Sequence, residues 1–283
     1  MDIRYDTFFQ LYQVMNYRRT AELLNLTQPA VTKQIQSLEK ELGRKLFVYD
    51  HHRLSKTPYA DILADYVTSL RYNYSQMRNE MKQEQSGLLR LGATKTIGDF
   101  VILPALQSYL KKSDCHFALE VDNTEALLSR LEQGTLDFAI VEGIFDKKKY
   151  ETRLLSKEKF IGICSERHPL ANRIVALSDL FPETIIVREE GPGTRAIFEQ
   201  ELNRNGYSLR TFSRYLEIGS FYLINQLIAD NAGISFVYEP VMLHEPGVAS
   251  FQVRNFEITH EFNIVSLKHA MLPDNARKFL AEL

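Results

Sequence analysis

The stretch from Thr27 to Gly43 constrains this chain most, because it carries the signals of one complete helix. Thr27 is a suitable N-cap, and Pro29 falls in the first turn, where no intrahelical hydrogen bond is lost. Gly43 is the expected stop. Apolar residues recur at intervals of four, three and four and form one stripe, made of Val31, Ile35, Leu38 and Leu42. The pattern predicts an amphipathic helix.

The opposite face of this helix is hydroxylic, amide-bearing and cationic, and it has no carboxylate before Glu39. Such side chains bond base edges and phosphates in the major groove of DNA. This polar face contains Thr32, Lys33, Gln36 and Lys40. An ordinary surface helix would show the same apolar stripe, so the neighbouring segments decide between the two interpretations.

Two shorter helices are predicted before this one, over Asp6–Met15 and Thr20–Leu24, with a tight connection at residues 25–27. Residues 17–36 therefore fit a helix-turn-helix, although a generic helical corner has the same pattern. Residues 1–57 hold nine Lys or Arg and six Asp or Glu, whereas the whole 283-residue chain has a net charge of −2. A basic head on an acidic body favours the DNA-binding interpretation.

A short hairpin, or wing, is predicted after this helix, from Leu46 to Lys56. Arg53 lies near its tip, where it is placed to contact DNA. The adjacent His51 and His52 suggest a metal ion, but adjacent side chains rarely converge on one ion and no third ligand follows nearby. We therefore expect neither a metal nor a cofactor.

Residues 58–84 predict one long linker helix, since this stretch has no glycine and no proline after Pro58. Its apolar residues alternate at intervals of four and three, as in a coiled-coil seam. The seam consists of Leu63, Val67, Leu70, Tyr74, Met77 and Met81. We expect this helix to pair two chains and to space two heads along DNA; the alternative is a helix packed against its own body.

Residues 85–87 read as a hinge, and from Leu88 onward the predicted strands and helices alternate. Such alternation is typical of α/β domains with largely parallel sheets. The strand candidates are Leu88–Gly92, Phe117–Asn123, Phe138–Glu142, Phe160–Ser165, Thr184–Arg188, Tyr215–Glu217, Ile234–Tyr238 and Ile264–Leu267. The helix candidates are Phe100–Lys111, Glu125–Gln133, Thr194–Asn205, Ser220–Asp230 and Asp274–Leu283.

The two cysteines, Cys115 and Cys164, provide no disulfide framework, and we interpret both as structural rather than redox-sensing. The sequence contains no signal-peptide pattern and no apolar run of transmembrane length. We expect a cytoplasmic protein without a membrane partner.

Over about fifty residues, the order and spacing of the head resemble the signature of LysR-type transcriptional regulators. The matching residues are Phe8, Phe9, Ala21, Leu24, Thr27, Gln28, Pro29, Ala30, Val31, Thr32, Gln34, Ile35, Leu38, Glu39, Leu42, Gly43, Leu46, Phe47 and Thr57. The chain departs from the usual pattern at Asn16, Arg18, Thr20, Tyr49, Lys56 and Ala60. Tyr49 stands where an arginine is common, which weakens the expected contribution of the wing.

This resemblance implies a fold class: an N-terminal all-α winged helix-turn-helix (1–57), the linker helix (58–84), and an α/β two-lobed effector domain (88–283). That domain would resemble periplasmic solute-binding proteins, with lobe one at 88–161 plus 268–283 and lobe two at 162–267. The resemblance also implies a sequence-specific regulator that binds double-stranded promoter DNA as a dimer or tetramer. A small effector would modulate this binding, with RNA polymerase as a further partner.

The residues expected to contact DNA lie on the predicted recognition helix and at the wing. They are Thr27, Gln28, Pro29, Ala30, Thr32, Lys33, Gln36 and Arg53.

Three strand-to-helix junctions in the effector domain carry hydroxyl groups, at residues 93–96, 191–195 and 217–220. Ligands of open α/β sheets bind at such junctions, where amides and hydroxyls can hold a small anion. Glu142 follows another strand and could receive an amine or simply face water. The expected effector site is Thr94, Lys95, Thr96, Glu142, Gly193, Thr194, Arg195 and Ser220. Thr96, Thr194 and Ser220 could equally be plain N-caps, and Arg195 a surface ion pair.

Two other classes of function fit parts of the pattern. One is a solute-binding or enzymatic α/β protein with an accessory head, but no nucleotide loop, metal cluster or nucleophile-with-base arrangement supports it. The other is an architectural DNA protein, which would not require two acidic α/β lobes. We therefore predict that the chain is not an enzyme. The operator, the effector and the direction of regulation stay open.

Overall fold

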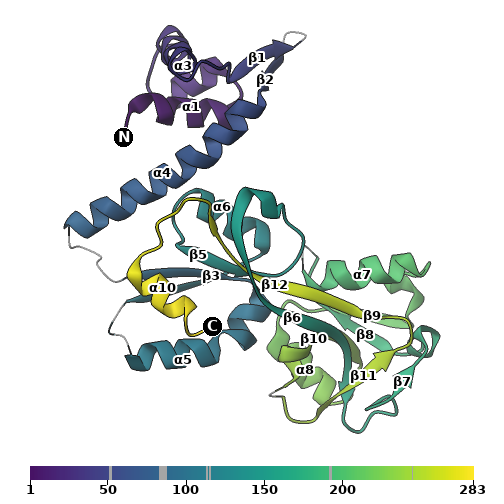
Figure 1. The fold of residues 1–283 in the computed structure, drawn as a ribbon. Coiled ribbons are helices and arrows are strands. Elements are labelled where there is room, and N and C mark those ends of the chain that lie inside the picture. Colours follow the sequence, from purple (N-terminus) through teal and green to yellow (C-terminus); the bar gives the residue numbers. More distant parts are fainter. Residues whose placement is uncertain (51–52, 83–87, 113, 115, 191–192, 244) are drawn as a thin grey trace.

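A computed structural model describes residues 1–50, 53–82, 88–112, 114, 116–190, 193–243 and 245–283. The predicted hinge at 85–87 and the residues His51, His52 and Cys115 lie outside these ranges. In Figure 1 a small helical head is joined by one long helix to a larger body of two lobes. The fold class predicted from the sequence is confirmed.

The head is a three-helix unit with a two-stranded wing. Its elements are α1 (Ile3–Val14), α2 (Tyr17–Leu23), α3 (Gln28–Leu42), β1 (Phe47–Asp50) and β2 (Arg53–Lys56). Phe8, Val31 and Leu38 are fully buried in its core, so the predicted apolar stripe does face inward. Leu42, the last residue of that stripe, is instead 41% exposed, because the core ends one turn before the helix does.

The long helix α4 (Pro58–Lys82) first packs against the head. Ala60, Ala64 and Val67 are buried in the core of the head, and Leu63 packs against the same cluster. Val67 has no exposed surface in the single chain, so placing it in a seam between chains was wrong, whereas Leu63 is half-buried. Spacing alone does not separate the two cases, because the face of α4 that meets the head has the same spacing of apolar residues as a coiled-coil seam.

Further along, α4 docks onto the body of its own chain. The Tyr72 hydroxyl donates to Asp137 at 2.9 Å, and the Asn73 side chain donates to the His269 carbonyl at 3.1 Å. The Met271 amide donates to Asn73 at 2.8 Å, and the Ser69 hydroxyl donates to the Lys268 carbonyl. The alternative of a helix packed on its own body is thus realised along one face of α4.

The body is built on one mixed sheet with strand order β4-β3-β5-β12-β6-β10-β8-β9 and with β11 and β7 beside β6. The strands are β3 (Leu89–Ala93), β4 (Phe117–Val121), β5 (Phe138–Val141), β6 (Tyr150–Ser165), β7 (Ile174–Val175), β8 (Thr184–Val187), β9 (Arg214–Glu217), β10 (Ile234–Tyr238), β11 (Val248–Val253) and β12 (Ile258–Leu267). The helices are α5 (Leu103–Lys112), α6 (Thr124–Glu132), α7 (Thr194–Arg204), α8 (Phe221–Ala229), α9 (Glu239–Met242) and α10 (Asp274–Leu280).

Within each lobe the short strands are parallel, as predicted: β3 pairs with β4 and β5, and β8 pairs with β9 and β10. The lobes are joined by β6 and β12, which pair antiparallel over their whole shared length and run from one lobe into the other (Figure 1). Parallel strands end at the same edge, so the carboxyl ends in each lobe point toward one common space.

The predicted crossovers at Phe160–Ser165 and Ile264–Leu267 were misplaced. β12 pairs with β5 of lobe one from Asn263 to Val265, so these residues belong to lobe one and the passage between lobes lies earlier in the strand. The earlier halves of β6 and β12 were missed because they mix charged and apolar residues and lie partly exposed. The strand β11 was missed as well.

Candidate nucleic-acid interface and ligand cavity

The caps of α3 fix its exposed face. The Thr27 hydroxyl accepts from the Ala30 amide at 3.3 Å, and Gly43 ends the helix with φ +65°, a left-handed conformation that suits glycine. Gln28, Lys33 and Gln36 are exposed on the face opposite the core. Both ends of the helix therefore match the sequence prediction.

The remaining predicted DNA-contacting residues differ in solvent exposure. Thr27, Pro29 and Arg53 are exposed, whereas Ala30 and Thr32 are half-buried. The Thr32 hydroxyl donates to the Gln28 carbonyl at 3.0 Å, which leaves its lone pairs and methyl group for contacts outside the helix.

Glu39 does not interrupt this polar face, because its carboxylate turns inward toward the wing. It accepts from the Leu46 amide at 2.9 Å and the Phe47 amide at 3.3 Å, and it pairs with Lys45 at 2.7 Å. Glu39 is only 7% exposed. This arrangement ties α3 to the wing and leaves the positive charge of Lys33 unopposed by a neighbouring exposed carboxylate until Glu41.

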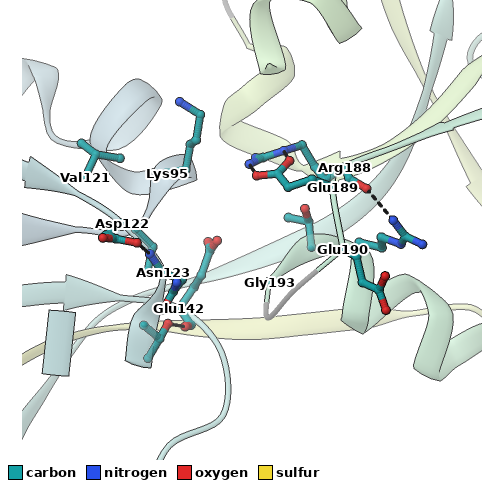
Figure 2. Close-up of a pocket in the computed structure, with 13 residues that line it drawn as sticks. Lys95, Val121, Asp122, Asn123, Glu142, Arg188, Glu189, Glu190 and Gly193 are labelled. Carbon is teal, nitrogen blue, oxygen red and sulfur yellow. Dashed lines mark hydrogen bonds and ion pairs between the residues drawn. The ribbon is translucent and has the colours of Figure 1, made fainter. Parts of the chain in front are cut away.

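A cavity of about 410 Å³ lies between the two lobes, at the carboxyl ends of the parallel strands (Figure 2). Lobe one contributes residues that follow β3, β4 and β5, and lobe two contributes residues that follow β8 and begin α7. The lining residues are Thr94, Lys95, Val121, Asp122, Asn123, Thr124, Glu142, Arg188, Glu189, Glu190, Gly193, Thr194 and Arg195.

Six of the eight predicted effector-site residues line this cavity: Thr94, Lys95, Glu142, Gly193, Thr194 and Arg195. Thr96 is buried behind the lining and donates to Glu142 at 3.1 Å. Ser220 lies outside the lining and accepts from the Leu223 amide at 3.4 Å, so it is the plain N-cap of α8. The structure therefore does not bring Ser220 into this cavity.

The segments Asp122–Thr124 and Arg188–Glu190 were missed as lining. The sequence reading placed Asp122, Asn123 and Arg188 within strands, although β4 ends at Val121 and β8 ends at Val187. A switch from apolar to polar residues marks the end of each strand in the sequence and could have identified these segments. Ligands of parallel sheets bind at this edge.

The arginines of lobe two are held in place by carboxylates. Arg188 makes two bonds to Glu189, at 2.6 and 2.5 Å, and its guanidinium lies 4.3 Å from the centre of the Phe221 ring. Arg195 bonds Glu199 at 2.9 Å and Glu217 at 2.6 Å. These hydrogen bonds raise the pKa of Arg195, so its charge is permanent.

Glu142 is the buried carboxylate of the lining, with 5% of its surface exposed. Burial raises the pKa of Glu142 to about 7, against the smaller opposing effects of the Thr96 hydroxyl and the charge of Arg188. Its proton occupancy is therefore sensitive to whatever enters the cavity.

Cys164 is fully buried in β6, and burial raises the pKa of its thiol to about 11. A thiol that stays protonated is a poor nucleophile, which agrees with the structural role predicted for it. Within the described residues, no helix is both long and apolar enough to cross a membrane.

Both the head and the body of the chain match families of known proteins. Residues 4–61 match the family described as bacterial regulatory helix-turn-helix protein, lysR family, and residues 82–283 match the LysR substrate binding domain. The chain is 27% identical over 280 residues to the HTH-type transcriptional regulator CysL of Bacillus subtilis, which covers 96% of this chain and 91% of that protein.

Two solved structures show the same architecture. A full-length OxyR variant from Pseudomonas aeruginosa matches with a TM-score of 0.59 and 18% identity, covering 99% of this chain and 93% of that one. The CcmR regulatory domain of Synechocystis PCC6803 in complex with 2-PG matches with a TM-score of 0.61 and 24% identity, covering 69% of this chain and 94% of that one. With its helix-turn-helix head and its cavity between two lobes, the chain belongs to the LysR family of transcriptional regulators.

Proposed function

We propose that this regulator reads promoter DNA with the exposed face of α3, chiefly through Gln28, Lys33 and Gln36. The observation that carries this proposal is that all three side chains are exposed while the carboxylate of Glu39 is withdrawn into the wing. Amide side chains can bond base edges, and a lysine can bond guanine or phosphate. Arg53, exposed in the wing, supplies a phosphate or minor-groove contact.

Gel-shift titration of the variants Gln28→Ala and Lys33→Ala tests this assignment, with duplexes recovered by genome-wide mapping of bound DNA. Each lost contact should weaken binding by roughly 5- to 100-fold, and Lys33→Ala should also lower the salt dependence if it contacts phosphate. Lys111→Ala, at an exposed lysine of α5, is the matched control. Unchanged affinity in both α3 variants would remove this face from the interface.

We further propose that two chains pair through the face of α4 that neither the head nor the body covers. Leu70, Tyr74 and Met77 are 47%, 42% and 43% exposed, and Met81 is 77% exposed. Such a row of exposed apolar side chains is costly in a single chain. A 25-residue helix is roughly 37 Å long, close to the about 34–36 Å between half-sites one DNA turn apart.

The double variant Leu70→Asp with Met77→Asp should shift the chain to a monomer in sedimentation equilibrium, since four charges would meet in the paired seam. Met271→Asp, at a residue 75% exposed outside α4, controls for the added charge. A dimer that survives the double change would place the seam elsewhere.

The ligand cavity is proposed to hold a small effector that carries an anionic group. The helix α7 begins at the cavity without a side-chain cap, so its first amides can receive an anion beside Arg188. Ligand binding would close the lobes and shift the population between two arrangements of the assembly on DNA. We propose RNA polymerase as a further partner and the cytoplasm as the location, and the role assigns no catalytic step to the chain.

A further inference from the structure

Two buried polar atoms at the lobe-one wall of the cavity have no hydrogen-bond partner among the described residues: Glu142 Oε2 and the Thr94 hydroxyl. Glu142 and Thr94 are 5% and 4% exposed, and both line the cavity. In Figure 2 the Glu142 side chain projects from lobe one toward the space between the lobes. Buried polar atoms are nearly always bonded, so these two mark a place where a ligand group belongs.

Glu142 is held firmly in this position. Its other carboxylate oxygen accepts from the Thr96 hydroxyl at 3.1 Å, and its backbone carbonyl accepts from the Thr124 hydroxyl at 2.6 Å. The orientation of Oε2 is thus set by the protein before any ligand arrives, as in a built site.

The charges around the cavity do not fit a purely anionic ligand. Three cationic and four carboxylate side chains line it. Each cation already has a carboxylate neighbour: Lys95 pairs with Asp99 at 3.3 Å, Arg188 with Glu189, and Arg195 with Glu199 and Glu217. In the described part of the chain no ion pair joins Glu142 to a cation, so the charge of Glu142 has no partner there when its carboxyl is ionised.

We propose that the effector is an amino-acid-like zwitterion, whose protonated amine donates to Glu142 Oε2 and to the Thr94 oxygen. Its carboxylate then meets the first amides of α7 and the guanidinium of Arg188. This inference rests on the proposed function, because it names the chemical class that the effector cavity takes.

The two walls of the cavity support this orientation. Acceptors without partners lie on lobe one, while the uncapped amides of Gly193–Arg195 and the Arg188 guanidinium lie on lobe two. A ligand with a cationic end and an anionic end bonds both walls at once. Neither end alone can do so, and closure of the lobes around the ligand follows from this division.

The number of protons taken up or released on binding depends on the charge of the ligand group beside Glu142. A purely anionic effector beside Glu142 would require the carboxyl to take up a proton, whereas an ammonium group favours the ionised form and expels one. Burial raises the pKa of Glu142 to about 7, so both exchanges are measurable near pH 6.5.

The test uses isothermal titration calorimetry of the full chain without DNA. The probes are the standard amino acids, one by one, each paired with the carboxylic acid that lacks its amine: propionate for alanine, succinate for aspartate, glutarate for glutamate. At least one amino acid should bind, at least tenfold more tightly than its deaminated counterpart. Repeating the titration at pH 6.5 in two buffers of different ionisation enthalpy should show proton release.

Glu142→Gln should weaken binding of that amino acid at least tenfold and abolish the proton release. Glu125→Gln, at an exposed carboxylate in the first turn of α6, should change neither. Hydrogen-exchange protection of β5 checks that the Glu142 variant is folded.

The proposal is overturned if no amino acid in the panel binds, if a deaminated acid binds equally well, or if binding takes up a proton. Glu142→Gln binding as tightly as the wild type would overturn it too. The proposed function is tested separately by the gel shift of the ligand-free chain. Loss of DNA binding in the gel shift would contradict the proposed function. The preference of the cavity for ligands with an amine could still be measured by calorimetry.

Discussion

The head and the cavity are assembled in opposite ways. All the residues proposed to contact DNA except Arg53 lie on α3 or at its cap, so one local helix presents the whole face. The cavity is lined by five separate segments between Thr94 and Arg195, drawn from both lobes. Because the DNA-contacting face is local, it can be predicted from sequence, and it depends on a few helix caps. The cavity depends instead on where strands distant in sequence end.

The largest effect is expected where the head depends on one buried carboxylate. Glu39→Ala would leave the Leu46 and Phe47 amides without their acceptor, at a cost of about 2–4 kcal/mol to the free energy of unfolding of the head. Hydrogen exchange in α3 under increasing urea measures this loss separately from the body. Glu41→Ala, at the exposed partner of Arg4, should change almost nothing. Equal losses in the two variants would contradict the anchoring role of Glu39.

The cavity should make the stability of the chain depend on pH through Glu142. The folded-state pKa of Glu142, about 7, lies above the ordinary value of 4.5, so the folded chain holds this proton more tightly than the unfolded chain. Stability from this group is fully present below about pH 4.5 and is lost as pH rises to about 7, by about 1–3 kcal/mol. Urea denaturation of the ligand-free body at several pH values measures the loss. Glu142→Gln should remove this part of the pH dependence; an unchanged profile would mean that Glu142 is not the titrating group.

The contrast between these regions also explains what the sequence could foretell. The cap at Thr27, the stripe from Val31 to Leu38 and the stop at Gly43 act within a few residues of one another, and the structure confirms each. Six cavity residues were predicted for the same reason, because strand ends are local signals. Arg188 and Asp122 were missed because the predicted strands ran one or two residues beyond the ends of β8 and β4, so these polar residues were counted as strand.

The helix α4 shows the limit of pattern reading. Its apolar spacing predicted one seam, but the chain uses α4 on three sides: Val67 in the head core, Tyr72 against lobe one, and Leu70 and Met77 toward solvent. Heptad spacing says that side chains share a stripe. It cannot say whether the stripe meets the same chain or another, because that depends on partners distant in sequence.

The link between head and body should weaken modestly when one contact of α4 is lost. Tyr72→Phe removes the hydroxyl that donates to Asp137 but leaves the bonds from Gln76 and the Arg90 amide, at 2.9 and 2.8 Å. The buried Asp137 keeps two donors, so the expected loss is about 1 kcal/mol. Thermal unfolding of the full chain measures it. A loss several times larger would show that Tyr72 holds the two regions together almost alone.

The smallest effect tests the boundary of the cavity itself. Ser220 caps α8 and stays outside the lining, so Ser220→Ala should lower the free energy of unfolding by about 0.5–1 kcal/mol without changing ligand affinity. Thr94→Val is the matched comparison, because it removes a hydroxyl that lines the cavity and has no partner there. Thr94→Val should weaken ligand binding in calorimetry and leave stability nearly unchanged. If Ser220→Ala weakened ligand binding instead, the cavity would have to extend to α8. The junction at residues 217–220 would then belong to the effector site, as the sequence predicted.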